Sequence, residues 1–166
     1  MKKILLGVAA VLLLAGGLTY VGGSFAAKMV RDELIAQKIS FPEKAKLQKD
    51  NPALTKYAGQ QVDNGEKAKA YSDYIDGHLA KIAGGQTYSE VSSQYQKNPS
   101  DQKLTGQRQS LFMGETLRGL LLNAWGWSII GSIALYVSYV LFLLAAVVVF
   151  VSFKYHAPNK KKTSRK

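Results

Sequence analysis

Two long runs without a charged residue dominate the pattern of hydrophobic and polar positions along the chain. The first run covers residues 4–27 and the second covers residues 119–153. An α-helix needs about 20 predominantly apolar residues to cross the hydrocarbon of a bilayer, so each run is long enough for one crossing. The pattern therefore predicts an all-α protein whose two transmembrane helices form an antiparallel hairpin, with a small extracytoplasmic helical cap between them.

The predicted organisation has five parts in chain order. They are a cytoplasmic N-terminus (1–3), a first transmembrane helix (4–26), an extracytoplasmic helical domain (27–118), a helix that contains the second transmembrane helix (119–153, with the crossing at about 127–153) and a basic cytoplasmic tail (154–166). The second run is too long for one crossing, so residues 119–124 are expected to project from the membrane. Aromatic side chains gather at membrane interfaces, which predicts that Trp125 and Trp127 mark the outer interface and Tyr155 the inner one.

The first run also has features of a secretory signal, which leaves two interpretations open. Two lysines precede the apolar stretch, and Ser24, Phe25 and Ala26 resemble a cleavage site with small residues. The apolar core of a signal is usually about 7–15 residues long, shorter than this run. We therefore expect an uncleaved anchor, whereas cleavage would leave a single-pass protein with most of its residues outside.

The distribution of charge predicts the orientation of the hairpin. The formal net charge is +11, yet all 11 acidic residues lie between the two apolar runs. Lys2 and Lys3 precede the first run, and six basic residues follow residue 153. The positive-inside rule then predicts a multi-pass membrane protein with both termini cytoplasmic and residues 27–118 outside. The basic tail is expected to contact anionic lipid headgroups, and no nucleic-acid partner is expected.

Small residues recur every seven positions in both apolar runs. They are Ala9, Gly16, Gly23, Gly131, Ser138 and Ala145. Small residues in register let helix backbones approach closely in lipid, and a seven-residue period suits a left-handed crossing. We expect the two helices to pack along these rows; the alternative is that glycine and alanine are simply frequent in membrane helices.

The middle of the chain is predicted to form short helices separated by turns. Capping boxes of the form S/T-x-x-E occur at residues 40–43 and 87–90. Residues 63–65 (Asp-Asn-Gly) are a turn signal, and the glycines at 84–85 are expected to end the helix that follows that turn. A long helix is expected to begin near Asp101 and to continue into the second apolar run. No alternating strand pattern is present.

Several short motifs in this middle segment occur in a familiar order. They are VRDEL (30–34), KI (38–39), VDNG (62–65), IDGH (75–78), GGQTYSE (84–90) and RQSLF (108–112). Their order between two apolar helices resembles a family of small two-pass membrane proteins of unknown activity, frequent in actinobacteria. The resemblance covers most of the chain. It implies this architecture and a location in a bacterial cytoplasmic membrane, but no activity. The common label of that family, aromatic-ring-opening dioxygenase, does not follow from these residues.

The residues that such a dioxygenase would need are too few. Extradiol-type iron chemistry uses two histidines and a carboxylate as metal ligands. The only histidines are His78 and His156, which the predicted topology places on opposite sides of the membrane. No enzymatic activity, cofactor or metal site is therefore expected. The absence of cysteine also excludes disulfides and thiol catalysis.

Two further candidate sites each have two interpretations. His78 is a candidate pH sensor or ligand-binding residue, because histidine titrates near neutral pH; the alternative is a side chain that bonds a neighbouring loop such as residues 87–90. Glu33 and Arg118 lie just outside the two crossings and are expected at similar heights in a hairpin. They either form a juxtamembrane pair, worth about 0–1 kcal/mol if solvated, or belong to a solvated charged collar.

Function is predicted mainly from what the apolar runs contain. Neither run has Asp, Glu, Lys, Arg or His, the groups on which proton relays and ion pathways usually depend. We therefore expect an accessory or scaffold subunit that interacts with another membrane protein or with itself. The alternative is an extracytoplasmic ligand-binding or sensor module anchored by two helices. A lipid-binding role would rest on the basic tail alone.

Overall fold

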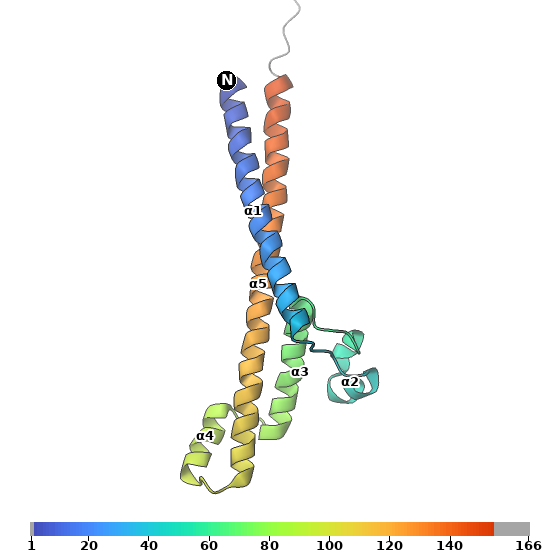
Figure 1. Cartoon of the computed structure of the whole chain (residues 1–166), viewed down its shortest axis with the longest axis vertical. Coiled ribbons are helices and arrows are strands. Elements are labelled where there is room, and N and C mark those ends of the chain that lie inside the picture. The colour runs from blue at the N-terminus through green and yellow to red at the C-terminus, as the bar shows by residue number, and fades with distance from the viewer. Residues whose placement is uncertain (1, 155–166) are drawn as a thin grey trace, which may run out of the picture. The chain divides into compact units, whose positions relative to one another are not determined.

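The structure, a computed structural model that describes residues 2–154, is built from helices. In chain order these are α1 (Lys2–Ala36), α2 (Lys44–Asp50), the 3-10 helix η1 (Pro52–Tyr57), α3 (Gly65–Ala83), α4 (Tyr88–Lys97) and α5 (Gln102–Lys154) (Figure 1). Between residues 2 and 154 there is no strand, only an isolated antiparallel bridge between Ser40 and Gln61. The all-α class is therefore confirmed. The predictions for Tyr155, His156 and the rest of the basic tail lie outside the described residues.

The chain divides into two compact units, which are described separately. Residues 2–25 and 130–154 belong to the first unit, and residues 26–129 form the second. The long helices α1 and α5 each contribute residues to both units.

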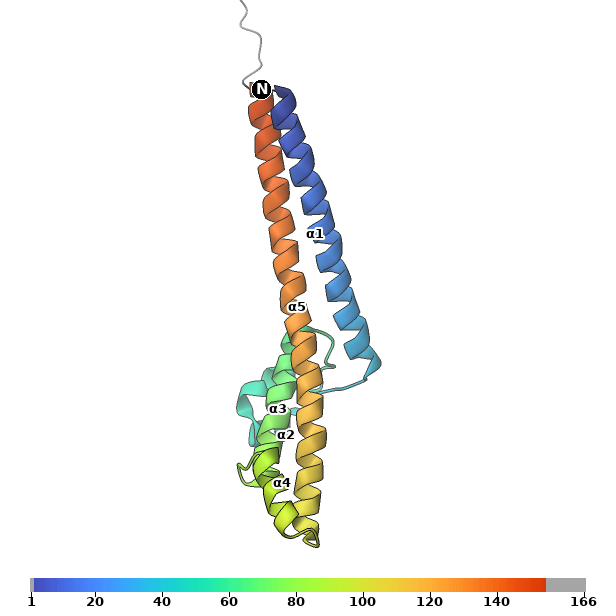
Figure 2. The ribbon, with the colours of Figure 1, turned by 90° about the vertical axis from the view of Figure 1, so that its left-hand side faces the viewer.

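The first unit consists of the apolar parts of α1 and α5, which lie side by side in both ribbon views (Figures 1 and 2). A Cβ atom at Gly16 would lie 2.8 Å from Phe142 Cε1, and one at Gly23 would lie 2.8 Å from the carbonyl oxygen of Gly131. Only glycine fits without movement of a neighbour at these two positions. The small residues singled out from the sequence are all buried: Ala9, Gly16, Gly23, Gly131, Ser138 and Ala145.

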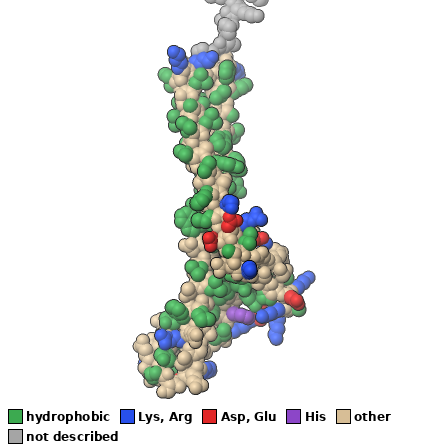
Figure 3. All heavy atoms as spheres, viewed as in Figure 1, with side chains coloured by type: hydrophobic (Ala, Val, Ile, Leu, Met, Phe, Trp, Pro, Cys, Tyr) green, Lys and Arg blue, Asp and Glu red, His purple; other side chains and the backbone are tan. Residues whose placement is uncertain are grey.

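The remaining faces of these two helices carry large apolar side chains that are exposed. Leu18 is 77% exposed and Phe150 is 67% exposed. In each of these helices only 11% of an apolar 18-residue stretch is buried, whereas a core helix of a water-soluble protein would bury most of such a stretch. Figure 3 shows apolar side chains spread over the visible face of this unit. By length and composition, both helices are candidate membrane spans.

The second unit has one main apolar core, to which every helix except α4 contributes. Its buried members are Val30, Leu34, Phe41, Leu47, Leu54, Tyr57, Val62, Ala68, Ala70, Tyr74 and Leu121. A smaller cluster packs α4 against α3 and α5 through Val91, Leu79, Ala83 and Leu111. Leu121 and Leu111 both lie on α5, so this helix packs against both clusters.

The connection between α1 and α3 corrects one prediction. Val62 N donates to Ile39 O at 2.9 Å, and Phe41 N donates to Gln60 O at 2.9 Å. These bonds hold Ser40 in extended backbone, so it does not cap a helix. The helix α2 instead begins after Glu43, which makes no side-chain capping bond. The predicted capping box at residues 40–43 is therefore wrong, because pairing with residues 60–62 overrides the local signal.

The glycine cap at 84–85 and the capping box at 87–90 are confirmed, and at the predicted turn of residues 63–65 the structure adds a helix cap. Asn64 caps α3 by accepting a hydrogen bond from Lys67 N at 2.9 Å. Gly84 and Gly85 follow α3 with φ angles of 61° and 79°, a left-handed conformation that glycine adopts without strain. Thr87 and Glu90 form a complete capping box at the start of α4. These turns set the direction of α4, which lies beside α5 in both ribbon views (Figures 1 and 2).

The capping box is expected to make the stability of α4 depend on pH. Glu90 Oε2 accepts from Thr87 N at 2.7 Å, and this backbone hydrogen bond holds the pKa of the Glu90 carboxyl below its usual value. A folded-state pKa below the unfolded value of about 4.3 gives stabilisation that is complete above that pH and is lost as the pH falls through the folded-state pKa. Hydrogen-exchange protection factors in α4 should therefore decrease on acidification below about pH 4. In Glu90→Gln they should be lower near neutral pH and insensitive to this acidification; an equal acid response in both proteins would contradict the prediction.

Candidate ligand groove between α1 and α5

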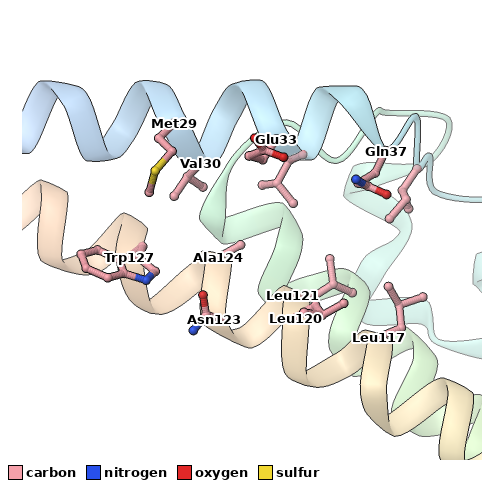
Figure 4. Close-up of a pocket in the computed structure, with 12 residues that line it drawn as sticks. Met29, Val30, Glu33, Gln37, Leu117, Leu120, Leu121, Asn123, Ala124 and Trp127 are labelled. Carbon is pink, nitrogen blue, oxygen red and sulfur yellow. The ribbon is translucent and has the colours of Figure 1, made fainter.

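An apolar groove of about 370 Å³ lies between α1 and α5 within the second unit (Figure 4). We call it the α1–α5 groove. Its apolar lining includes Met29 and Val30 from α1 and Leu120, Ala124 and Trp127 from α5. Figure 4 shows Met29 and Val30 on the side of α1 that faces α5. The volume is at the small end of the range of ligand pockets, about 300–1,000 Å³.

Each wall of the groove is formed mainly by one face of a helix. On α5, the lining residues Leu117, Leu120, Ala124 and Trp127 are spaced three, four and three residues apart, which places them on one side of the helix. On α1, the lining residues Val30, Glu33 and Leu34 also share one side of the helix, and Gln37 follows from the turn at the end of α1. The shape of the groove therefore depends mainly on two helices, with Gln37 and Ile39 of the connection after α1 at one end.

The base of the groove belongs to the core, whereas its edges are exposed. Leu34 and Leu121 are only 6% and 2% exposed and belong to the main apolar cluster. Leu120 is 65% exposed and Trp127 is 45% exposed. The groove is therefore already formed, because its base is buried. Covering its exposed apolar edges would be favourable in free energy.

Three polar side chains interrupt this apolar lining. Glu33 comes from α1, Gln37 from the turn directly after α1, and Asn123 from α5. Within residues 2–154 none of these three side chains has a hydrogen bond or ion pair. Lys28, a nearby cation on α1, pairs with Asp32 rather than with Glu33. The groove thus offers one carboxylate acceptor and two amides that can both donate and accept.

The predicted pair between Glu33 and Arg118 is wrong. Arg118 Nη1 lies 2.9 Å from Asp76 of α3 and 2.8 Å from Glu115 of α5. The sequence places Glu33 and Arg118 at similar positions along two helices, but α3 packs beside α5 and supplies a closer carboxylate. Glu33 is left to line the groove instead.

His78 contacts its own helix. Its Nε2 atom lies 3.4 Å from Tyr74 Oη, and the two ring centroids are 4.9 Å apart. The suggested bond to the loop at residues 87–90 is therefore not the contact that the structure has. No group of three His, Asp or Glu side chains suited to a metal ion occurs in the part of the chain that is described.

The two tryptophans have different surroundings. Trp125 is 36% exposed and lies under Lys69 Nζ, which is 5.9 Å from its ring centroid. Trp127 lines the groove. Both positions leave aromatic surface exposed, as a residue at a membrane interface would have.

The groove was not anticipated from the sequence. A usable signal was present, because the seven-residue rows continue beyond the small residues: Gly23 is followed by Val30 and Gln37, and Gly131 is preceded by Ala124 and Leu117. Val30, Gln37 and Leu117 are larger than the small residues of these rows and prevent close backbone contact, so a gap between the helix faces is expected there.

Comparisons of the chain with protein-family models, with curated proteins and with solved structures gave no match. The family resemblance drawn from the sequence motifs therefore stays a hypothesis.

Proposed function

We propose that the chain is a two-pass protein of a bacterial cytoplasmic membrane that acts as an accessory or scaffold subunit for another membrane protein or for itself. In this proposal α1 and α5 form an antiparallel hairpin. Both termini lie in the cytoplasm, and residues 27–118 form an extracytoplasmic helical domain. The crossings are 4–26 and about 127–153, and the basic tail meets anionic headgroups.

The observation that carries the proposal is the division of side chains in the first unit. Residues with small side chains are buried between the helices, and large apolar residues such as Leu18 and Phe150 are exposed. In water this arrangement would expose a large apolar surface, which is costly at about 25 cal/mol per Å². In lipid the same arrangement costs nothing and allows close van der Waals contact. The order of contacts also supports an antiparallel pair, since Gly16 meets Phe142 and the later Gly23 meets the earlier Gly131.

The accessory role is supported by the character of the exposed surface in the second unit. Phe112 and Met113 on α5 are each 59% exposed, and Ile82 at the end of α3 is 45% exposed. Exposed large apolar side chains outside the proposed crossings are available for contact with a partner protein. The sequence itself offers no set of residues for covalent or metal-dependent chemistry.

A second candidate function, a ligand-binding or sensor module, is favoured by the α1–α5 groove. The groove combines an apolar lining with a few unpartnered polar side chains, which is the usual composition of a small-molecule site.

The topology can be tested with single cysteines, because the natural chain has none. Ser89→Cys, at an exposed position in α4, is expected to react with a membrane-impermeant maleimide on intact cells. Lys3→Cys is expected to react only after the cells are opened. Labelling of Lys3→Cys alone on intact cells would invert the proposed orientation.

The accessory role is tested by affinity purification of the full chain from native membranes. A stoichiometric membrane-protein partner, or a defined homo-oligomer, is the expected result. A monomer that retains only a small molecule would favour the sensor module instead.

A further inference from the structure

We propose that the α1–α5 groove binds one hydrocarbon chain of a membrane lipid whose headgroup carries a primary ammonium group, with Glu33 as the residue that selects the headgroup. This inference names the ligand class of the second candidate function and rests on the proposed membrane placement. It assigns a role to Glu33, Trp127 and the apolar faces that line the groove.

The dimensions and composition of the groove fit a hydrocarbon chain. Its α5 wall extends from Leu117 to Trp127, which is roughly 15 Å along a helix. The lining is mainly aliphatic, with Leu34 and Leu121 closing the base. Covering exposed side chains such as Leu120 removes apolar area from water and so favours binding of an apolar chain.

Charge complementarity points to a cationic headgroup. Glu33 is the only ionisable residue that lines the groove, and its carboxylate has no partner within the described chain. Arg31 lies two residues away on α1, and side chains two apart do not face the same side of a helix. A primary ammonium donates hydrogen bonds to a carboxylate and to the amide oxygens of Gln37 and Asn123. An anionic headgroup would meet like charge at the same place.

The position of the groove along the chain supports a membrane lipid as the source of this ligand. The lining residues of α5 end at Trp127, which is the proposed start of the second crossing. The lining residues of α1 begin at Met29, shortly after the proposed end of the first crossing. A lipid of the outer leaflet can therefore reach the groove without leaving the interface.

Tryptophan fluorescence provides a direct test, because only one of the two tryptophans lines the groove. Trp125→Phe leaves Trp127 as the reporter, and Trp127→Phe leaves Trp125 as a reference outside the groove. Each full-length variant is reconstituted into phosphatidylglycerol vesicles that contain a small, equal fraction of brominated phosphatidylethanolamine or brominated phosphatidylglycerol. Brominated chains quench a tryptophan that they contact.

We expect brominated phosphatidylethanolamine to quench Trp127 with an apparent affinity about fivefold higher than brominated phosphatidylglycerol, the preference that one partly exposed charge pair provides. Trp125 should be quenched equally by both lipids. In Glu33→Gln, the two brominated lipids should quench Trp127 with nearly equal apparent affinities. Glu43→Gln is the control, because it removes an exposed carboxylate that lies at the start of α2 and does not line the groove. This variant should keep the fivefold preference at Trp127.

Each other outcome overturns the inference in a recognisable way. If the two lipids quench Trp127 equally when Glu33 is present, or if the preference persists in Glu33→Gln, selective binding in the groove is disproved. Neither result contradicts the proposed membrane placement. If neither tryptophan is quenched, both the proposed membrane placement and the proposed lipid binding are contradicted.

A second copy of the chain is the competing occupant, and a cysteine separates it from lipid. Leu120→Cys places a single thiol at the exposed edge of the groove in a chain without other cysteines. The lipid proposal expects this thiol to stay monomeric under mild oxidation in the membrane. A dominant disulfide-linked dimer would show that another copy covers the groove and would overturn the proposal.

Discussion

Gly23→Ala is expected to destabilise the packing of α1 on α5 by about 2 kcal/mol, within the usual range for overpacking. The new Cβ atom would lie 2.8 Å from the carbonyl oxygen of Gly131 and 3.1 Å from the backbone nitrogen of Leu135. Backbone atoms cannot rotate away as a side chain can, so the two helices must separate. Thermal unfolding of the purified protein in one fixed detergent should show a lower midpoint for the variant.

Gly22→Ala provides the matched control for this prediction. It makes the same change one residue earlier, where an added Cβ has nothing within 4 Å. Alanine is more favourable than glycine in a helix interior by up to about 1 kcal/mol, so the control variant should be neutral or stabilising. If both variants changed the midpoint equally, close contact at Gly23 would have no energetic role and the proposed hairpin would lose its main support.

Gly65→Ala is expected to destabilise the second unit by about 3 kcal/mol, near the upper end for added volume at a packed position. Gly65 is the first residue of α3 and is buried. A Cβ there would lie 2.3 Å from Ser128 Cβ, an atom attached directly to the backbone of α5. Because neither atom can rotate away, the start of α3 must move off α5. Loss of hydrogen-exchange protection across α3, together with a lower unfolding midpoint, is the measurement.

Two companion variants make the result for Gly65 specific. Gly77→Ala lies on the same helix with nothing within 4 Å of the added atom, and it should stabilise the protein slightly. Ser128→Gly removes the atom that the new methyl group meets. The double variant should therefore lose less free energy of unfolding than the sum of the losses in the two single variants. Strict additivity would show that the close approach of Gly65 and Ser128 does not determine stability.

Local capping signals allowed much of the second unit to be predicted from sequence. Asn64, Gly84 and Thr87 act on backbone groups within a few residues of themselves, so their role can be inferred without the fold. The same reasoning fails at Ser40, although its sequence pattern is as good as that at Thr87. Backbone pairing with residues about twenty positions later decides the conformation there, and a local pattern carries no information about it.

The candidate site could be predicted only in part, for a similar reason. The sequence singled out Glu33, Arg118 and Trp127, but it could not assign their neighbours. Arg118 pairs with Asp76, which lies on a helix whose position depends on the core of the second unit. The groove exists only because two helix faces leave space between them, and that space is a property of packing rather than of any residue.

The burial of the small residues between α1 and α5 has a consequence for neighbours in a bilayer. The outer surface of the proposed hairpin then carries bulky exposed groups such as Leu18 and Phe150, with exposed glycines between them at Gly7 and Gly22, where an added Cβ would have nothing within 4 Å. In the proposed membrane placement, a third helix would have room to approach the backbone of α1 at these two glycines, and acyl chains would cover the bulky positions. A partner held at these glycines, or at exposed apolar side chains of the second unit such as Phe112, would then be released by detergent rather than by salt.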